Sequence, residues 1–157
     1  MSANHEIPLE RVRTLMERIA DAAGVDATVE VRDADDGLHG EFVGEDLGLL
    51  IGHHGQTIDA IQHLAYRIAS ANMDPTHRVS VLVDAAGYRE RRATALRATA
   101  DQAAQQAISA GHAVSLDAMS ALERKVIHEH LKDRHDVETY SEGQEPSRYL
   151  VVAPLVD

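Results

Sequence analysis

Two glycines three residues apart, Gly52 and Gly55, constrain the fold of this chain more than any other feature. Leucines within residues 47–50 and an amphipathic pattern over residues 55–71 predict a short helix before the pair and a longer helix after it. Glycine permits a tight turn and places no side chain in the path of a ligand, and a helix that begins there presents unpaired N–H groups. A plain corner between two helices is the alternative interpretation of this spacing.

The segments around the glycine pair predict one small mixed domain. A helix is expected at residues 8–23, and strands are expected at residues 27–32, 38–43 and 78–84. The resulting order is helix, strand, strand, helix, helix, strand, with the Gly-x-x-Gly sequence between the two central helices. This arrangement is typical of a KH domain, whose Gly-x-x-Gly loop holds the backbone of single-stranded RNA. We therefore expect a KH domain over residues 1–84.

The rest of the chain predicts a long helix and a second small domain. An alanine-rich stretch over residues 86–109 predicts a helix that ends at Gly111. Beyond it we expect a strand at residues 113–115, a helix capped by Asp117, and strands at residues 137–140 and 148–152. The chain is thus expected to have an α/β (α+β) fold in three parts. These are the KH domain at residues 1–84, a connecting helix at residues 85–110 and a second domain at residues 111–157.

The helix of the second domain carries another motif. Arg124 and His128 are four residues apart and therefore share one helix face. The apolar positions expected to enter the core are Met119, Leu122 and Val126. Because these point elsewhere, we expect the Arg124 face to be exposed and to clamp phosphate, with Lys125 beside it. An ordinary solvated helix face is the alternative interpretation.

The residues that follow this helix give the motif more weight. Residues 139–148 have the pattern Thr-x-Ser-x-Gly-x-Glu-Pro-x-Arg, and a predicted strand comes next. With Arg124 and His128, this pattern resembles the single-stranded nucleic-acid-binding domain that is named for its Arg-xxx-His signature, the R-three-H domain. A KH domain followed directly by such a domain resembles one bacterial family, the Jag or SpoIIIJ-associated proteins, also called KH-domain RNA-binding protein B. The resemblance includes residues 51–64, 84–92 and 119–152.

The resemblance implies a type II KH fold and an RNA-binding protein. It also implies RNA chaperoning or post-transcriptional control, links to cell shape and cell-envelope synthesis, and pairing with a small KH-only protein. Single-stranded RNA is the expected ligand, with single-stranded DNA as the alternative. The residues expected to bind it are Gly52, His53, His54, Gly55, Arg124, Lys125 and His128, followed by Arg148, Arg89 and Arg92. A structural role is the alternative for Arg148, and salt bridges between the domains are the alternative for Arg89 and Arg92.

Three features depart from the family pattern. The N-terminal Jag domain is expected to be absent, because the KH pattern starts almost at Met1. The loop carries His53 and His54 where the family usually has at least one Lys or Arg. Residues 1–84 carry six Arg and no Lys against fifteen Asp and Glu, which gives a net charge of −9. Residues 85–157 carry nine Lys and Arg against eleven Asp and Glu, which gives a net charge of −2. We therefore expect the loop to supply geometry more than charge, and to bind RNA more tightly at pH 6 than at pH 8.

The composition argues against several other classes of protein. The chain has no cysteine and only 3% aromatic residues, which argues against disulfides, thiolate metal sites and domains that stack bases on exposed rings. No apolar run approaches the roughly 20 residues that span a bilayer, and no targeting pattern is present, so a cytoplasmic protein is expected. Catalytic motifs and metal-ligand spacings are also missing, so we expect no enzyme, metal or cofactor. The net charge of −11 keeps one alternative open, an acidic adaptor that pairs with another KH protein and has weak or no RNA binding through its KH half.

Overall fold

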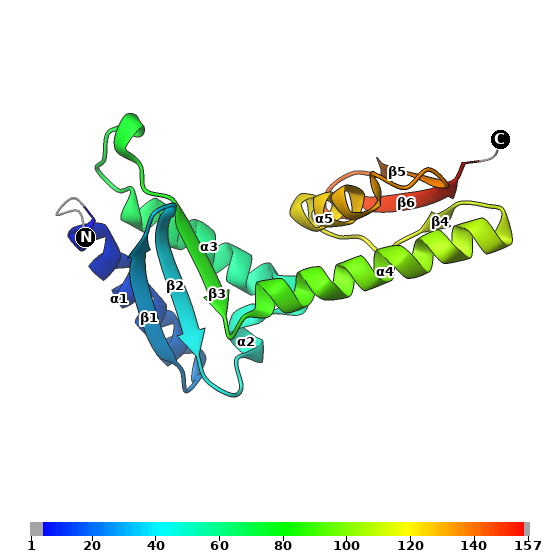
Figure 1. Cartoon of the computed structure of the whole chain (residues 1–157). Coiled ribbons are helices and arrows are strands. Elements are labelled where there is room, and N and C mark those ends of the chain that lie inside the picture. The colour runs from blue at the N-terminus through cyan, green and yellow to red at the C-terminus, as the bar shows by residue number, and fades with distance from the viewer. Residues whose placement is uncertain (1–4, 156–157) are drawn as a thin grey trace. The chain divides into compact units, whose positions relative to one another are not determined.

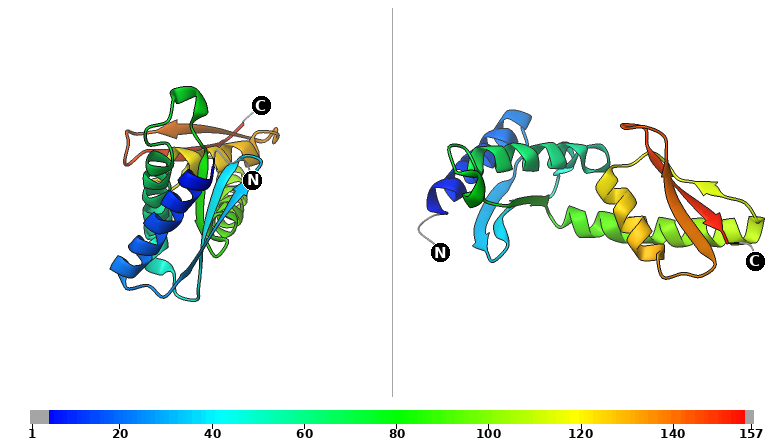
Figure 2. Two further views of the ribbon diagram at one scale, coloured as in Figure 1. Left: turned by 90° about the vertical axis from the view of Figure 1, so that its left-hand side faces the viewer. Right: turned by 90° about the horizontal axis from the view of Figure 1, so that it is seen from above.

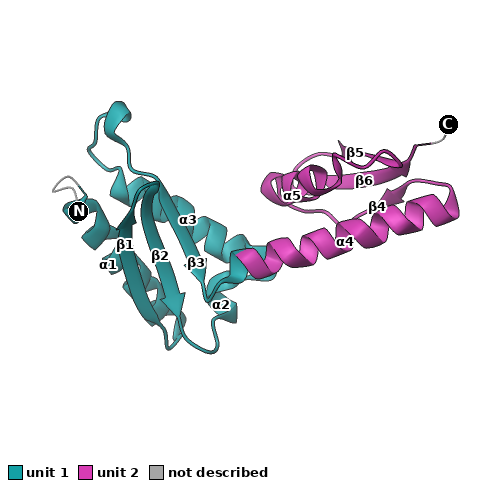
Figure 3. Ribbon diagram, viewed as in Figure 1, with its two compact units in different colours: residues 1–89 teal, residues 90–157 magenta. Residues whose placement is uncertain are grey.

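The computed structural model describes residues 5–155, which form two compact units that divide between Arg89 and Glu90 (Figures 1 and 3). Each unit has its own three-stranded sheet and its own hydrophobic core. The first unit contains α1 (Glu6–Ala23), β1 (Thr28–Ala34), β2 (Gly37–Val43), α2 (Gly48–Ile51), α3 (Gln56–Ala69) and β3 (Val81–Ala85). The second contains most of α4 (Tyr88–Ala110), then β4 (Val114–Ser115), α5 (Ala121–Leu131), β5 (Val137–Glu142) and β6 (Tyr149–Pro154).

The sheet of the first unit has the strand order β1-β2-β3. Strand β1 pairs antiparallel with β2, and β2 pairs parallel with β3. The parallel pair requires a long crossover, and α2 and α3 provide it. Helices α1 and α3 lie side by side on one face of the sheet (Figure 2). The expected order of elements for a KH domain is therefore confirmed.

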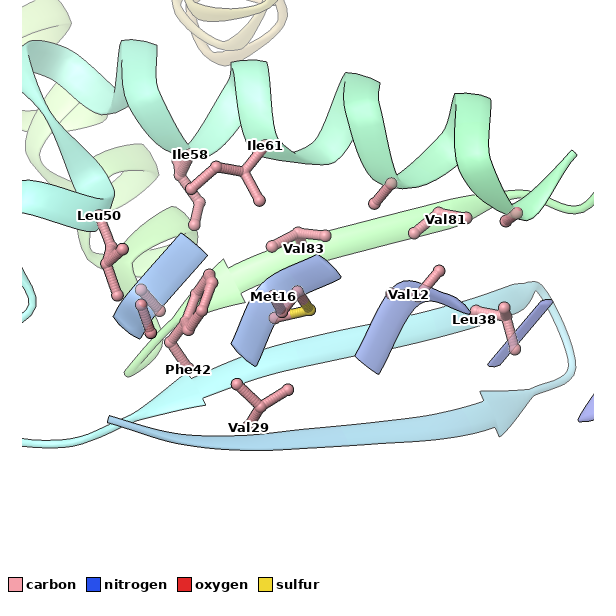
Figure 4. Packing of buried hydrophobic residues seen from close by; sticks show 14 of the residues in the cluster. Val12, Met16, Val29, Leu38, Phe42, Leu50, Ile58, Ile61, Val81 and Val83 are labelled. Carbon is pink, nitrogen blue, oxygen red and sulfur yellow. The ribbon is translucent and has the colours of Figure 1, made fainter. Parts of the chain in front are cut away.

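The core of the first unit fixes the ends of the two helices that flank the glycine pair. Leu50 of α2 and Ile58 of α3 are almost fully buried and lie close to Phe42 of β2 and Val83 of β3 (Figure 4). Burying side chains of this size stabilises the fold by about 1.5–3 kcal/mol each. Both ends of the loop are thus anchored to the sheet through its flanking helices.

The second unit packs α4 and α5 against one face of an antiparallel sheet with the order β4-β6-β5. Residues 85–110 were expected to be a connecting helix, but α4 is also a core element of this unit. Its buried residues, mostly small, are Leu96, Ala100, Ala103, Ala104 and Ala107. These residues share one buried cluster with Ile127, Leu131, Val137, Leu150 and Val152.

Two local expectations about the second unit are wrong. Helix α5 is capped by Ser120, whose hydroxyl accepts a hydrogen bond from the Glu123 N–H at 3.2 Å, and Asp117 lies outside the helix. Leu122, expected in the core, is 68% exposed. Helix α5 begins later in the sequence than expected, and it buries Arg124, Ile127 and Leu131 instead of Leu122. Within residues 5–155, the helices are too short or too polar to cross a membrane.

Candidate nucleic-acid interface

The Gly-x-x-Gly sequence forms a sharp turn between α2 and α3. Helix α2 ends at Ile51, and a short 3₁₀ turn over His53–Gly55 leads directly into α3. Three of the four loop residues have positive φ angles, 74° at Gly52, 52° at His54 and 78° at Gly55. The chain therefore reverses direction here within a few residues, as expected for a KH loop.

The structure explains why both ends of the turn are glycines. Gly52 combines φ 74° with ψ −179°, a region that only glycine occupies without strain. A Cβ atom there would also collide with the side chain and backbone N of Thr57. At Gly55, a Cβ atom would lie 2.7 Å from the ring of Tyr88. Any side chain at either position would have to displace its neighbours.

The loop directs the N-terminus of α3 toward solvent. The first N–H groups of an α-helix have no intrahelical acceptor and carry a partial positive charge. Among the described residues, no side chain caps this end of α3. His53 and His54 are exposed beside it, with their rings stacked at a centroid separation of 3.8 Å. This surface can donate hydrogen bonds to an anion, although the loop contains no Lys or Arg.

Arg89 lies against α3, and 27% of its side chain is exposed. Its guanidinium donates to Asp59 Oδ1 at 2.8 Å, to Gln62 Oε1 at 3.0 Å and to the Val83 carbonyl at 2.8 Å. Gln62 in turn accepts from the Val83 N–H at 3.0 Å. The expectation that Arg89 extends an RNA-tracking surface is therefore not supported by its contacts, because its donors are directed at the first unit itself.

Arg124 is buried, contrary to the expected exposed face. Only 7% of the residue is accessible. Its guanidinium donates to the Met119 carbonyl at 2.7 Å, to the Arg148 carbonyl at 3.4 Å and to the Glu145 carboxylate. The hydrogen bond from Arg124 lowers the pKa of Glu145 below its ordinary value. Arg124 thus joins the start of α5 to the loop between β5 and β6.

The rest of the Arg-xxx-His face is exposed. His128 Nδ1 lies 2.5 Å from Thr139 Oγ1 on β5, which directs the other ring nitrogen away from this contact. Lys125 is exposed on the next position of α5. Farther along the helix, Lys132 donates to Glu129 at 2.7 Å, and this bond raises the pKa of Lys132 and lowers that of Glu129. Lys125 and His128 are the members of the predicted set that present side chains to solvent in this unit.

The remaining two predicted cations make intramolecular contacts. Arg148 donates to the Gly143 carbonyl at 2.8 Å and to the Ser141 carbonyl at 3.4 Å, across the loop between β5 and β6. Arg92 donates to Glu123 at 2.6 Å within the second unit. The structural alternative considered for Arg148 thus agrees with its contacts. Arg92 is paired as expected of a salt-bridge residue, but its partner belongs to its own unit.

Comparison with known families matches both halves of the chain. Residues 10–82 match the family model described as KhpA/KhpB, KH domain, and residues 94–154 match the R-three-H domain. RNA-binding protein KhpB of Bacillus subtilis is 31% identical over 148 residues, which cover 93% of this chain and 70% of that protein. The proteins of the same name from Lactiplantibacillus plantarum and Clostridium symbiosum are 46% and 33% identical over 68% and 88% of this chain.

The chain belongs to the KhpB family. The resemblance inferred from the two motifs is therefore confirmed. The match covers only 32% of the Lactiplantibacillus KhpB and 62% of the Clostridium KhpB. The R-three-H match begins at residue 94, inside α4, which agrees with the packing of that helix in the second unit. Within residues 139–148, Glu145 and Arg148 fasten the loop to which they belong.

Three residues near the Gly52–Gly55 loop were not identified from the sequence as part of the site. They are Asp59, Gln62 and Tyr88, which contact Arg89 or Gly55. Asp59 and Gln62 lie on the first two turns of α3, so helical spacing from the glycine pair indicates their position but not their partner. Among residues 5–155, no three His, Asp or Glu side chains are grouped closely enough to hold a metal ion.

Proposed function

We propose that this chain binds single-stranded RNA through the Gly52–Gly55 loop. The observation that supports it best is the backbone of the loop. Two glycines in conformations that exclude side chains lead into an uncapped helix of fourteen residues. Such a helix end suits a phosphate group, and the similar proteins are named RNA-binding protein KhpB.

In this proposal the loop holds the RNA backbone by geometry. A phosphate rests over Gly52 and Gly55 and accepts hydrogen bonds from the first N–H groups of α3. A hydrogen bond to a charged group contributes about 1.5–3 kcal/mol, so two or three such bonds are sufficient for weak, sequence-tolerant binding. His53 and His54 add hydrogen bonds when neutral and charge when protonated.

The second unit provides a further contact in this proposal. Lys125 and His128 are exposed on one side of α5, and both can approach phosphate oxygens. Because residues 85–157 carry a net charge of −2 against −9 for residues 1–84, this half repels a phosphate chain less. Arg124 and Arg148 act indirectly, by fixing the loop between β5 and β6.

The biological role that we infer is RNA chaperoning or post-transcriptional regulation in the cytoplasm. Binding through the RNA backbone tolerates many RNA sequences, which suits both roles. Links to cell shape and cell-envelope synthesis, and a small KH-only protein partner, extend this proposal by family resemblance.

The decisive test adds negative charge to the loop without changing its glycines. In the double variant His53→Asp, His54→Asp, the new carboxylates repel phosphate, and aspartate tolerates the positive φ at residue 54. Asn72→Asp, His77→Asp is the matched control, because it adds the same charge to exposed positions beyond the other end of α3. Fluorescence anisotropy with a short labelled single strand should show at least about tenfold weaker binding for the loop variant alone. Equal binding by both variants would contradict the proposal.

The acidic adaptor is the second candidate function, because the first half has a net charge of −9. A salt titration separates the two functions. Phosphate contacts make RNA affinity fall steeply as salt rises, whereas an adaptor shows no RNA binding even at low salt.

A further inference from the structure

A carboxylate lies close to the proposed phosphate site. Asp59 is in the first turn of α3 and is exposed over nearly half of its side chain. A negative group at this end of a helix is favoured by the helix dipole, but it also competes with any phosphate placed there. In a loop with no Lys or Arg, an uncompensated carboxylate at this point opposes RNA binding.

The carboxylate of Asp59 is paired with Arg89. Arg89 Nη1 donates to Asp59 Oδ1 at 2.8 Å, while Nη2 and Nε hold Gln62 and the Val83 carbonyl. The Arg89 guanidinium is therefore held by three acceptors on α3 and β3, so its charge stays beside Asp59. This pair belongs wholly to the first unit.

Two other carboxylates near Arg89 are occupied by backbone groups. Asp84 Oδ1 accepts from the N–H groups of Ala85 at 2.8 Å and Arg89 at 3.2 Å. Glu41 Oε1 accepts from the Gly87 N–H at 3.1 Å. Asp59 differs from Asp84 and Glu41 because it lies in the first turn of α3, beside the Gly52–Gly55 loop, and is paired with a cation.

We propose that Arg89 is a positioning residue for RNA binding, which acts by cancelling the charge of Asp59 at the N-terminus of α3. This inference rests on the proposed function. It reverses the role expected from the sequence, since Arg89 does not touch the ligand. Arg89 instead allows a neutral loop to accept a phosphate inside a strongly acidic unit.

The test is a double-mutant cycle on the full chain with a short labelled single strand. Arg89→Met should weaken RNA binding about three- to tenfold, as expected for one unit charge roughly 8 Å from a phosphate at a dielectric constant between those of water and a protein surface. Asp59→Asn should strengthen RNA binding by a similar factor, because it leaves the charge of Arg89 uncompensated beside the phosphate. The double variant Arg89→Met, Asp59→Asn should return to about wild-type affinity, because neither charge remains.

The rescue separates charge from structure. Asp59→Asn cannot restore the bonds that Arg89 makes to Gln62 and Val83, so a purely structural role predicts that the double variant binds as weakly as Arg89→Met. That outcome would overturn the proposal, as would an unchanged affinity for Arg89→Met.

A second variant covers the case in which Arg89→Met does not fold. Arg89→Lys keeps the positive charge but lacks the planar guanidinium. The proposal requires the RNA affinity of this variant to stay within about threefold of wild type at low salt. A larger loss of affinity in a folded protein would overturn the proposal. Failure of the proposed function would look different, because the His53→Asp, His54→Asp variant would then retain its affinity.

Discussion

Replacing Arg124 tests whether the signature arginine of the second unit is structural. We expect Arg124→Ala to destabilise this unit by about 3 kcal/mol. The charged hydrogen bond to the Met119 carbonyl, at 2.7 Å, contributes about 1.5–3 kcal/mol. The buried methylenes lost on truncation contribute about 0.8 kcal/mol each. We add no figure for the Glu145 pair, whose contribution is small because that carboxylate is exposed to solvent, and little for the longer bond at 3.4 Å.

The assay is hydrogen exchange on the intact chain, followed in β5 and β6, together with a thermal melt. A loss of about 3 kcal/mol should raise local exchange on the order of a hundredfold and lower the melting midpoint by roughly 10–20 °C for a domain of 60–100 residues. Lys125→Ala is the control, since it removes an exposed cation from the same helix and should change neither quantity. If Arg124→Ala exchanges and melts like wild type while losing RNA affinity, Arg124 is a contact residue and the structural interpretation is wrong.

Four further outcomes follow from the structure. RNA affinity should be higher at pH 6 than at pH 8, because protonated histidines attract phosphate, and His53→Ala, His54→Ala should abolish the difference. Equal affinities at both pH values would refute a role for these rings. Lys125→Ala, His128→Ala should weaken RNA binding in an anisotropy titration, while the fold loses only the exposed His128–Thr139 hydrogen bond, about 0.5–1.5 kcal/mol. An unchanged RNA affinity would refute a contact role for the two side chains. Phe42→Ala should destabilise the first unit by about 3–5 kcal/mol, because it empties a fully buried position. A denaturant titration in which the free energy of unfolding falls by less than about 1 kcal/mol would contradict this packing. Arg124 lowers the pKa of Glu145 from its ordinary value near 4.5. The stability that this ion pair adds should therefore be present above about pH 4.5 and be lost as the pH falls through the lower pKa of the folded state. A stability difference between wild type and Glu145→Gln that persisted at pH 2 would argue against the ion pair.

The sequence indicated the fold of the first unit well because its signals are local. Alternating residues define the strands, helical spacing defines α1 and α3, and the two glycines define the turn between α2 and α3. Each of these signals depends on neighbours only a few residues away. The same is true of the alanine-rich helix α4, whose existence was predicted correctly.

Burial and partner choice were harder to predict because they depend on contacts between distant residues. Arg124 reaches Glu145, and Arg89 reaches Asp59, across separations of 21 and 30 residues. Nothing in the local pattern distinguishes such an arginine from one that points at a phosphate. The error at α5 was of the same kind, since the helix buries Arg124 and Ile127 and leaves the apolar Leu122 exposed.

The measurement that tests the central claim most directly is an NMR titration of the amides with a short single-stranded RNA. If the loop seats a phosphate on the N-terminus of α3, the largest shifts should fall on Gly55, Gln56 and Thr57. The amides of Arg89 and Arg124 should move little. Shifts concentrated elsewhere in the first unit, with the α3 N-terminus unchanged at saturating RNA, would contradict the account.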